Sequence, residues 1–477
     1  MRRAVIVAGL FWTLGTVGAG APAPEVLSSA QRATAEGLRD RALKGTRAAA
    51  LATDLCDEAG ARMPGSEGDR RAVAWGIRTA RAIGLSNARS ERVPVNLWRR
   101  GEESGRVVSP TNIPLALTAL GGSVGTPPGG LEAEIVEAAS LEDLAAKPPD
   151  AVRGKIVFLN RRMRKSADFS GYSEMGRTRS RAASTAASRG AVGVLIRSLG
   201  TNDDRAPHTG GMRYTEGVAK IPAAALSLPD ADLLERLLRR GGPVRVQFTL
   251  GCRDAGPGES ANVLAEVPGR GRPEEIVLLG CHLDSWDLGV GAVDDAAGCG
   301  IVLEAARLIA ELPADARPRR TIRVVLFANE EHGLGGGKEY VRAHAAELPR
   351  HVAAIEADAG SGLPNGLSWN AGASAEPAVV AIATLLAPVA SLTLEAKGSG
   401  GADISRLLPA GVPLFGLRQD STRYFDLHHT ANDTPDKLEP ASLDRAVATV
   451  AVWAYVAADL ETPFERIPEN KRKENEE

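Results

Sequence analysis

The sequence has few cysteines and almost no net charge. Four of its 477 residues are cysteine, at positions 56, 252, 281 and 299. That is too few for a disulfide scaffold, and none is placed like a nucleophile with a histidine partner. The 57 Lys and Arg nearly balance the 59 Asp and Glu, which leaves a formal net charge of −2. Nucleic acid and anionic lipid need a positive surface, so we expect neither as a partner.

Long apolar runs are also missing after the N-terminus. Arg2 and Arg3 precede an apolar run over residues 4–17 and small residues over 18–23, which is typical of a signal peptide covering residues 1–23. An uncleaved anchor is the alternative, but a bilayer span takes about 20 apolar residues. We therefore expect an exported chain, secreted or periplasmic, with no stable membrane insertion after cleavage.

The length indicates two packed domains after the targeting segment. Hydrophobic residues make up 44% and charged residues 24%, as in globular proteins. The segments we expect are the signal peptide (1–23), the N-terminal part of the main domain (24–121), an inserted module (122–251), the rest of the main domain (252–470) and a charged tail (471–477).

The N-terminal half contains helical patterns and one compact module. Residues 27–54 and 69–83 have helical periodicity, and Gly84 is a plausible stop for the second helix. The stretch 121–130 is rich in Gly and Pro and is expected to be a domain boundary. After it, a strand over 154–159, a helix over 180–189 and a strand over 191–196 predict a small α/β or β-rich module that ends near Gly251.

From about residue 274 the pattern alternates between strands and helices. The sequence predicts strands at 275–281, 321–328, 352–357 and 412–417, and helices at 295–312, 335–348, 375–388 and 441–460. This alternation is typical of an α/β, doubly wound, mainly parallel sheet with helices on both faces. In such a sheet, functional sites lie beyond the carboxyl ends of the strands.

Histidines and carboxylates gather at those strand ends. The clustered residues are His282, Asp284, Asp294, Asp295, Glu330, Glu331, Glu356, Asp358, His428, His429 and Asp433. A lone pair such as Asp294–Asp295 is often only a helix cap. The chain has just seven histidines, however, and His282 and His429 both fall in acidic, strand-end contexts. The joint arrangement therefore favours a functional site.

Carboxylates packed so closely would repel one another without a cation. Two divalent metals, each held by one histidine and one carboxylate and bridged by a third carboxylate, remove this repulsion. Mixed His and carboxylate donors suit zinc with an open position for water. Zinc lowers the pKa of such a water to about 7, and a carboxylate not bound to metal can take its proton. The residue types thus predict a site for peptide hydrolysis.

The run from His282 to Asp295 resembles the two-zinc aminopeptidase family. Further motifs over residues 98–104, 125–128 and 207–210 extend the resemblance over nearly all of the mature chain. Residues 122–251 resemble a protease-associated domain. The resemblance implies five metal ligands, which are His282 and Asp358 on one zinc, Glu331 and His429 on the other, and Asp294 as the bridge.

The resemblance also implies roles for three neighbours of these ligands. Glu330 would be the general base and Asp284 would orient His282. His429 is chosen over His428 because it lies four residues before Asp433, as the family pattern requires. Many family members have a tyrosine at the position of His428, which could still donate a hydrogen bond to the oxyanion.

The activity implied is that of an exopeptidase on small peptides with a free amino end, more narrowly a dipeptidase, in a homodimer. We expect the polar stretch 201–217, which includes His208, to reach the cleft or the partner chain. Cobalt or manganese could replace zinc in practice. A receptor-like binding protein and a one-zinc glutaminyl cyclase are the alternatives, and the complete ligand set argues against both.

Overall fold

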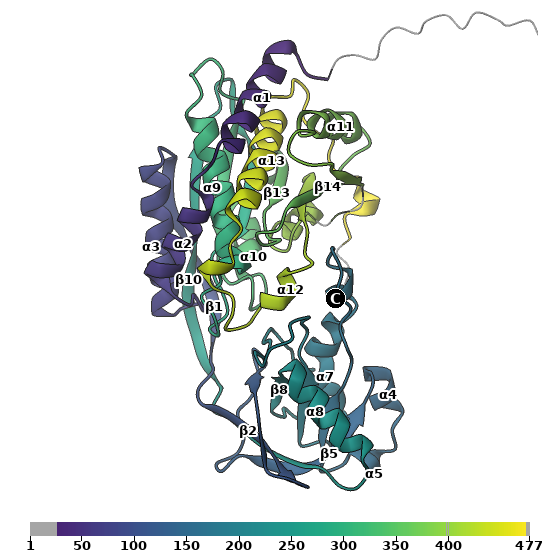
Figure 1. Ribbon diagram of the computed structural model, residues 1–477. Coiled ribbons are helices and arrows are strands. Elements are labelled where there is room, and N and C mark those ends of the chain that lie inside the picture. Colours follow the sequence, from purple (N-terminus) through teal and green to yellow (C-terminus); the bar gives the residue numbers. More distant parts are fainter. Residues whose placement is uncertain (1–25, 397, 399, 474–477) are drawn as a thin grey trace, which may run out of the picture.

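The computed structural model describes residues 26–396, 398 and 400–473. The expected signal peptide and residues 474–477 of the expected tail lie outside this part. Figure 1 shows a larger lobe, which contains α1, α9 and α13, above a smaller lobe that contains α7 and α8. Within the described residues, no helix is both long enough and apolar enough to cross a bilayer.

The larger lobe is built on an eight-stranded sheet. In spatial order its strands are β1 (Ser86–Arg99), β10 (Arg253–Val267), β12 (Arg320–Phe327), β11 (Arg272–His282), β13 (His351–Glu356), β16 (Leu414–Gln419), β14 (Pro364–Asn370) and β15 (Thr393–Glu395). The four central strands, β12, β11, β13 and β16, are parallel, as expected. β14 and β15 also pair parallel. The sheet is therefore mainly parallel, as expected, with antiparallel pairs of β1 with β10, β10 with β12 and β14 with β16 at its flanks.

Helices cover both faces of this sheet, as expected. Val277, Leu279 and Cys281 of β11 point into the core beneath one layer of helices. Leu278 points to the opposite side, where α10 lies. The helices are α1 (Ser29–Leu43), α2 (Ala48–Ala59), α3 (Glu67–Ala82), α9 (Ala297–Ala310), α10 (Gly335–Ala343), α11 (Ala375–Leu385), α12 (Tyr424–Leu427) and α13 (Pro440–Asp459).

The N-terminal helical pattern is divided in two. The stretch expected to be helical over 27–54 forms α1 and the start of α2, and residues 44–47 between them leave the helical path. Gly45 in this break has φ 121°, a value that glycine adopts easily because it has no Cβ. Gly84 follows α3 with φ 83° and ends that helix as predicted.

The smaller lobe is the inserted module, and it begins earlier than residue 122. Its eight strands in spatial order are β3 (Ile113–Leu115), β2 (Glu103–Ser109), β9 (Arg245–Leu250), β5 (Leu131–Ala138), β6 (Ile156–Leu159), β7 (Gly193–Arg197), β8 (Ala223–Leu226) and β4 (Leu117–Ala119). Because β2, β3 and β4 belong to this sheet, the turn-rich stretch 121–130 is a loop within the module.

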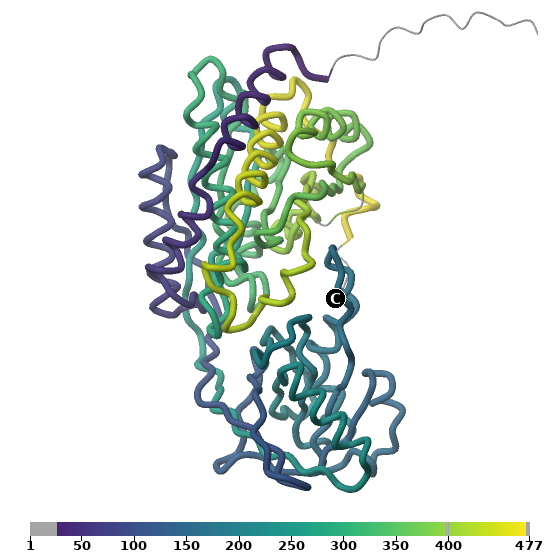
Figure 2. Tube along the Cα trace, viewed as in Figure 1, coloured from purple at the N-terminus to yellow at the C-terminus, as the bar shows by residue number. Residues whose placement is uncertain are grey.

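Helices accompany the strands of the module, so it is an α/β unit. They are α4 (Leu141–Ala146), α5 (Pro149–Val152), α6 (Ser170–Ser173), α7 (Gly176–Ser188) and α8 (Leu228–Arg239). The chain enters the module from β1 to β2 and returns from β9 to β10. Figure 2 shows these two crossings side by side, in agreement with the antiparallel pairing of β1 with β10 and of β2 with β9.

The close approach of α2 to α9 depends on a glycine. A Cβ added at Gly300 would lie 2.3 Å from the carbonyl oxygen of Ala48, whereas one added at Gly37 in α1 would meet nothing within 4 Å. Gly300→Ala is expected to destabilise the protein by about 1–3 kcal/mol through overpacking. Gly37→Ala is expected to stabilise it by roughly 0.5–1 kcal/mol because alanine favours helix. Urea unfolding of both variants checks this, and equal effects would contradict it.

Candidate metal centre

Five side chains expected in one site do come together, at the carboxyl edge of the central strands. His282 is the last residue of β11 and Asp358 closely follows β13. Glu331 follows β12, and His429 follows the short helix α12. Asp294 lies in the turn at Ala292–Ala296 that leads into α9.

Asp294 lies between the two histidines. Its Oδ1 is 3.1 Å from Nε2 of His282, and its Oδ2 is 3.4 Å from Nε2 of His429. His282 Nε2 is also 3.7 Å from Oδ1 of Asp358. His429 Nε2 is 3.0 Å from Oε2 of Glu331. Each histidine therefore has its own carboxylate, and the two share Asp294.

His428 lies against the same group. Its ring stacks on that of His429 with centroids 3.5 Å apart, and its Nε2 is 3.7 Å from Oδ2 of Asp294. Asp294, His428 and His429 form one compact set of possible metal donors, and His282, Asp294 and Asp358 form the other. Near His429 there are therefore two further possible metal donors, His428 and Glu331.

Asp284 supports the site in a different way from the one expected. The Nδ1 of His282 is 3.0 Å from the main-chain oxygen of Asp284 and 3.9 Å from its carboxylate. The carboxylate instead accepts the backbone N–H groups of Glu330, at 2.9 Å, and Glu331, at 3.3 Å. Asp284 lies beyond the end of β11, whose last residue is His282.

Two further carboxylates fix the backbone around Asp294. Asp433 accepts the N–H groups of Val293, at 2.6 Å, and Asp294, at 3.2 Å. Asp295 accepts the N–H groups of His282, at 3.1 Å, and Gly298, at 3.0 Å. The peptide bond between Asp294 and Asp295 is cis. The Asp295 carboxylate thus faces backbone N–H groups, whereas that of Asp294 faces the rings of His282 and His429.

The electrostatics of the site favour a bound cation. Burial raises the pKa of Glu330 to about 8 and that of Asp358 to about 6. Burial and the charge of Asp294 raise the pKa of Glu331 well above its usual range. Oδ2 of Asp294 and Oε1 of Glu331 are buried without a hydrogen-bond partner. Buried anions of this kind need compensating charge, so these nitrogen and oxygen donors fit a divalent metal.

The inserted module reaches this site, as expected for the stretch 201–217. The His208 Nδ1 is 2.7 Å from the main-chain oxygen of His428. The backbone N–H of Thr209 donates to the main-chain oxygen of His429 at 3.0 Å. Thr201 also donates through its N–H to the carbonyl of Phe425 at 2.9 Å.

Sequence reasoning missed Trp286 and Tyr424. The indole N–H of Trp286 donates to Oε2 of Glu331 at 2.7 Å. Tyr424 is buried, and its ring centroid is 5.2 Å from that of His428. Trp286 falls inside the motif that carried the family resemblance, but its spacing gave no sign of a contact with Glu331. Tyr424 had no distinguishing neighbour in the sequence.

A parallel-centred α/β sheet with buried histidines and carboxylates at its carboxyl edge defines a hydrolase of the metallopeptidase type. The profile of peptidase family M28 matches residues 262–454. Carboxypeptidase Q from Mus musculus is 36% identical over 412 residues, which cover 86% of each chain, and the human protein of that name is 35% identical over the same length. The chain therefore belongs to peptidase family M28.

Solved structures agree with this assignment. The crystal structure of a peptidase M28 precursor from Shewanella amazonensis has a TM-score of 0.89 at 43% identity and covers 92% of this chain and 99% of its own. A zinc aminopeptidase from Bacillus subtilis shares the fold, with a TM-score of 0.63 at 21% identity over 88% of this chain and 98% of its own. The expected family resemblance and the expectation of a peptide-bond hydrolase are confirmed.

Both compact donor sets contain Asp294, so one substitution tests both. Asp294→Asn is expected to lose divalent metal from both sets, because one amide oxygen cannot replace two carboxylate oxygens. Asp69→Asn is the matched control, since this buried carboxylate accepts from the Ser260 hydroxyl and the Gly65 N–H, outside the donor group. Elemental analysis after dialysis against a chelator compares the two variants with the parent protein. Metal content that falls equally in both variants would contradict this assignment.

Proposed function

We propose that the chain is an exported metallo-exopeptidase with two zinc ions that cleaves small peptides bearing a free amino end, dipeptides in particular. The observation that carries the proposal is the Asp294 carboxylate between His282 and His429, each beside its own carboxylate. Membership of the M28 family and relatives named carboxypeptidase Q support it.

His282 and Asp358 would hold one zinc, Glu331 and His429 the other, and Asp294 would contact both. When bound, zinc supplies a Lewis acid that polarises the scissile carbonyl and makes a water molecule more acidic. Asp284 and Asp433 hold the backbone of these ligands by accepting its N–H groups. The ligand directions are therefore fixed before any substrate arrives.

Glu330 is the general base in this proposal. Its neighbour Glu331 places Oε2 3.0 Å from Nε2 of His429 and is the ligand. Glu330, whose backbone N–H donates to Asp284 at 2.9 Å, is left to act as the base. Glu330 takes a proton from the attacking water and passes it to the leaving amine. His428 has a buried Nδ1 without a hydrogen-bond partner and would donate to the oxygen of the tetrahedral intermediate.

The inserted module would limit access to short peptides. Thr201, His208 and Thr209 contact the segment that carries His428 and His429, so a long peptide would have to pass between the module and that segment. Resemblance to a protease-associated domain supports this role. A signal peptide over residues 1–23 and a homodimer complete the proposal.

Free and end-blocked dipeptides test the proposed activity. With zinc added, the purified protein is expected to hydrolyse free dipeptides and to leave N-acetylated ones intact, because the proposal requires a free amino end. Amine release measured by chromatography checks this. Equal cleavage of the acetylated peptides would contradict an exopeptidase. No cleavage of any peptide would favour the receptor-like alternative, and cyclisation of an N-terminal glutaminyl peptide would favour the cyclase.

Substitutions of the two neighbouring glutamates distinguish the general base from the metal ligand. Glu330→Gln is expected to keep both metals and to lose about 10²–10⁴-fold in kcat, the usual contribution of a positioned base. Glu331→Gln is expected to weaken metal binding at one site. Metal content and kcat are measured on the same preparations. Loss of zinc from folded Glu330→Gln, or near-normal turnover by it, would show that these roles are wrong.

A further inference from the structure

The two halves of the metal centre are supported from different parts of the molecule. The ring of His282 contacts the main-chain oxygen of Asp284, and the backbone N–H of His282 donates to the Asp295 carboxylate. Both partners belong to the larger lobe. The side chain of Glu331, in contrast, is contacted by Trp286, which packs on Gly121 of the inserted module. His429 is contacted by Thr209 within the module.

Trp286 connects Glu331 to the module. Its indole N–H donates to Oε2 of Glu331 at 2.7 Å, and the side chain is buried. The opposite edge of the ring packs directly on Gly121, where an added Cβ would lie 1.9 Å from Cη2 of Trp286. The position of the indole, and with it the direction of the Glu331 carboxylate, thus depends on the module backbone.

Thr209 connects His429 to the module. Its backbone N–H donates to the main-chain oxygen of His429 at 3.0 Å. Its main-chain oxygen is 3.3 Å from Nδ1 of His429, so Nδ1–H is the donor and Nε2 is left free for a metal. His429 has φ 62°, a left-handed conformation that a non-glycine residue holds only with outside support.

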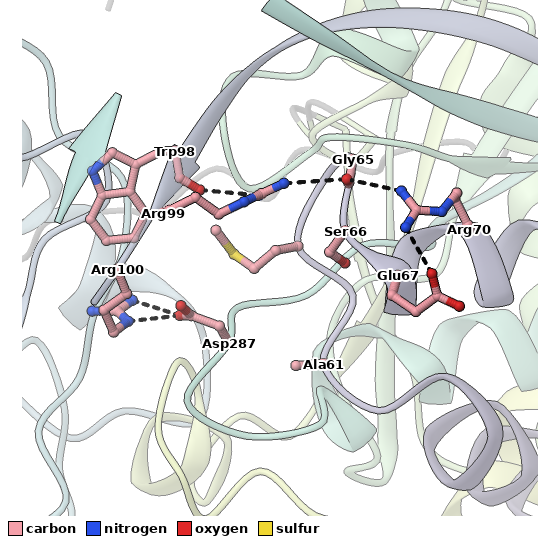
Figure 3. A pocket seen from close by; sticks show the side chains of 10 residues that line it. Ala61, Gly65, Ser66, Glu67, Arg70, Trp98, Arg99, Arg100 and Asp287 are labelled. Atoms are coloured by element: carbon pink, nitrogen blue, oxygen red, sulfur yellow. Dashed lines mark hydrogen bonds and ion pairs between the residues drawn. The ribbon is translucent and has the colours of Figure 1, made fainter. Parts of the chain in front are cut away.

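Arg100 links these two supports. Its guanidinium donates to Asp287, next to Trp286, at 2.7 Å and to the Thr209 hydroxyl at 3.2 Å. It also donates to the Ala119 carbonyl in β4 at 2.8 Å. Figure 3 shows Arg100 and Asp287 in contact on the wall of a cavity of about 540 Å³, close to Trp98. One side chain at the crossing between the lobes therefore ties both supports together.

We propose that the inserted module is a structural part of one metal site, where it sets the affinity of the Glu331–His429 pair through Trp286 and Thr209. The His282–Asp358 pair is held without it. Trp286 is then a positioning residue, and displacement of the module releases one metal ahead of the other. This inference rests on the proposed two-metal function.

Two tryptophans at the junction give a matched test. Trp286→Phe removes the N–H that reaches Glu331. Trp98→Phe removes an equally buried N–H, which donates to the main-chain oxygen of Ser123 at 2.9 Å. Stepwise zinc dissociation constants are measured on the metal-free protein by competition with a coloured chelator. Trp286→Phe is expected to raise the dissociation constant of one of the two zinc ions by about 10–100-fold and to leave that of the other unchanged. Trp98→Phe is expected to change neither.

A second pair of variants leaves the chemical identity of Trp286 unchanged. Gly121→Ala forces the indole to move, whereas Gly176→Ala, at the start of α7, adds a Cβ in open space. Of these two variants, only Gly121→Ala is expected to raise the dissociation constant of one zinc ion. Unchanged constants in Trp286→Phe, equal weakening of both ions, or an equal effect of Trp98→Phe would overturn the inference. Failure of the parent protein to bind two ions would instead refute the proposed function on which it rests.

Discussion

The buried carboxylate of Asp294 is the constraint around which the site is organised. It is 5% exposed, and it lies within 3.4 Å of both His282 and His429. An anion in such a place is stable only with strong compensation. Neighbouring carboxylates, such as Asp358 and Glu331, increase the negative charge that must be compensated. A divalent cation bound by these nitrogen and oxygen donors would provide that compensation.

Backbone amides compensate three other buried carboxylates around Asp294. Asp284, Asp295 and Asp433 are all buried, and each accepts two backbone N–H groups from the loops that carry the donor residues. These contacts also fix the loops, because each carboxylate can satisfy its two amides in only one arrangement. The same interaction therefore stabilises the buried charge and orients the side chains around Asp294.

The module adds support that the sheet cannot provide. Strand ends fix His282 directly, since β11 is hydrogen-bonded on both sides. His429 lies in a loop with a left-handed backbone and has no strand to hold it. Thr209 contacts His429, and His208 contacts the neighbouring His428, so the module supports this loop. The stretch that we propose limits access to the site is therefore the same one that contacts the segment of His428 and His429.

The sequence alone was enough to predict the central strands, their helices and the set of residues around Asp294. Hydrophobic periodicity and strand-end position are local properties, and both were visible in it. Only the tertiary structure showed that Asp284 contacts His282 through its main chain, that β2 to β4 belong to the module, and that Trp286 and Thr209 support the site. These features depend on where separate segments meet, because packing between distant residues leaves no local pattern in the chain.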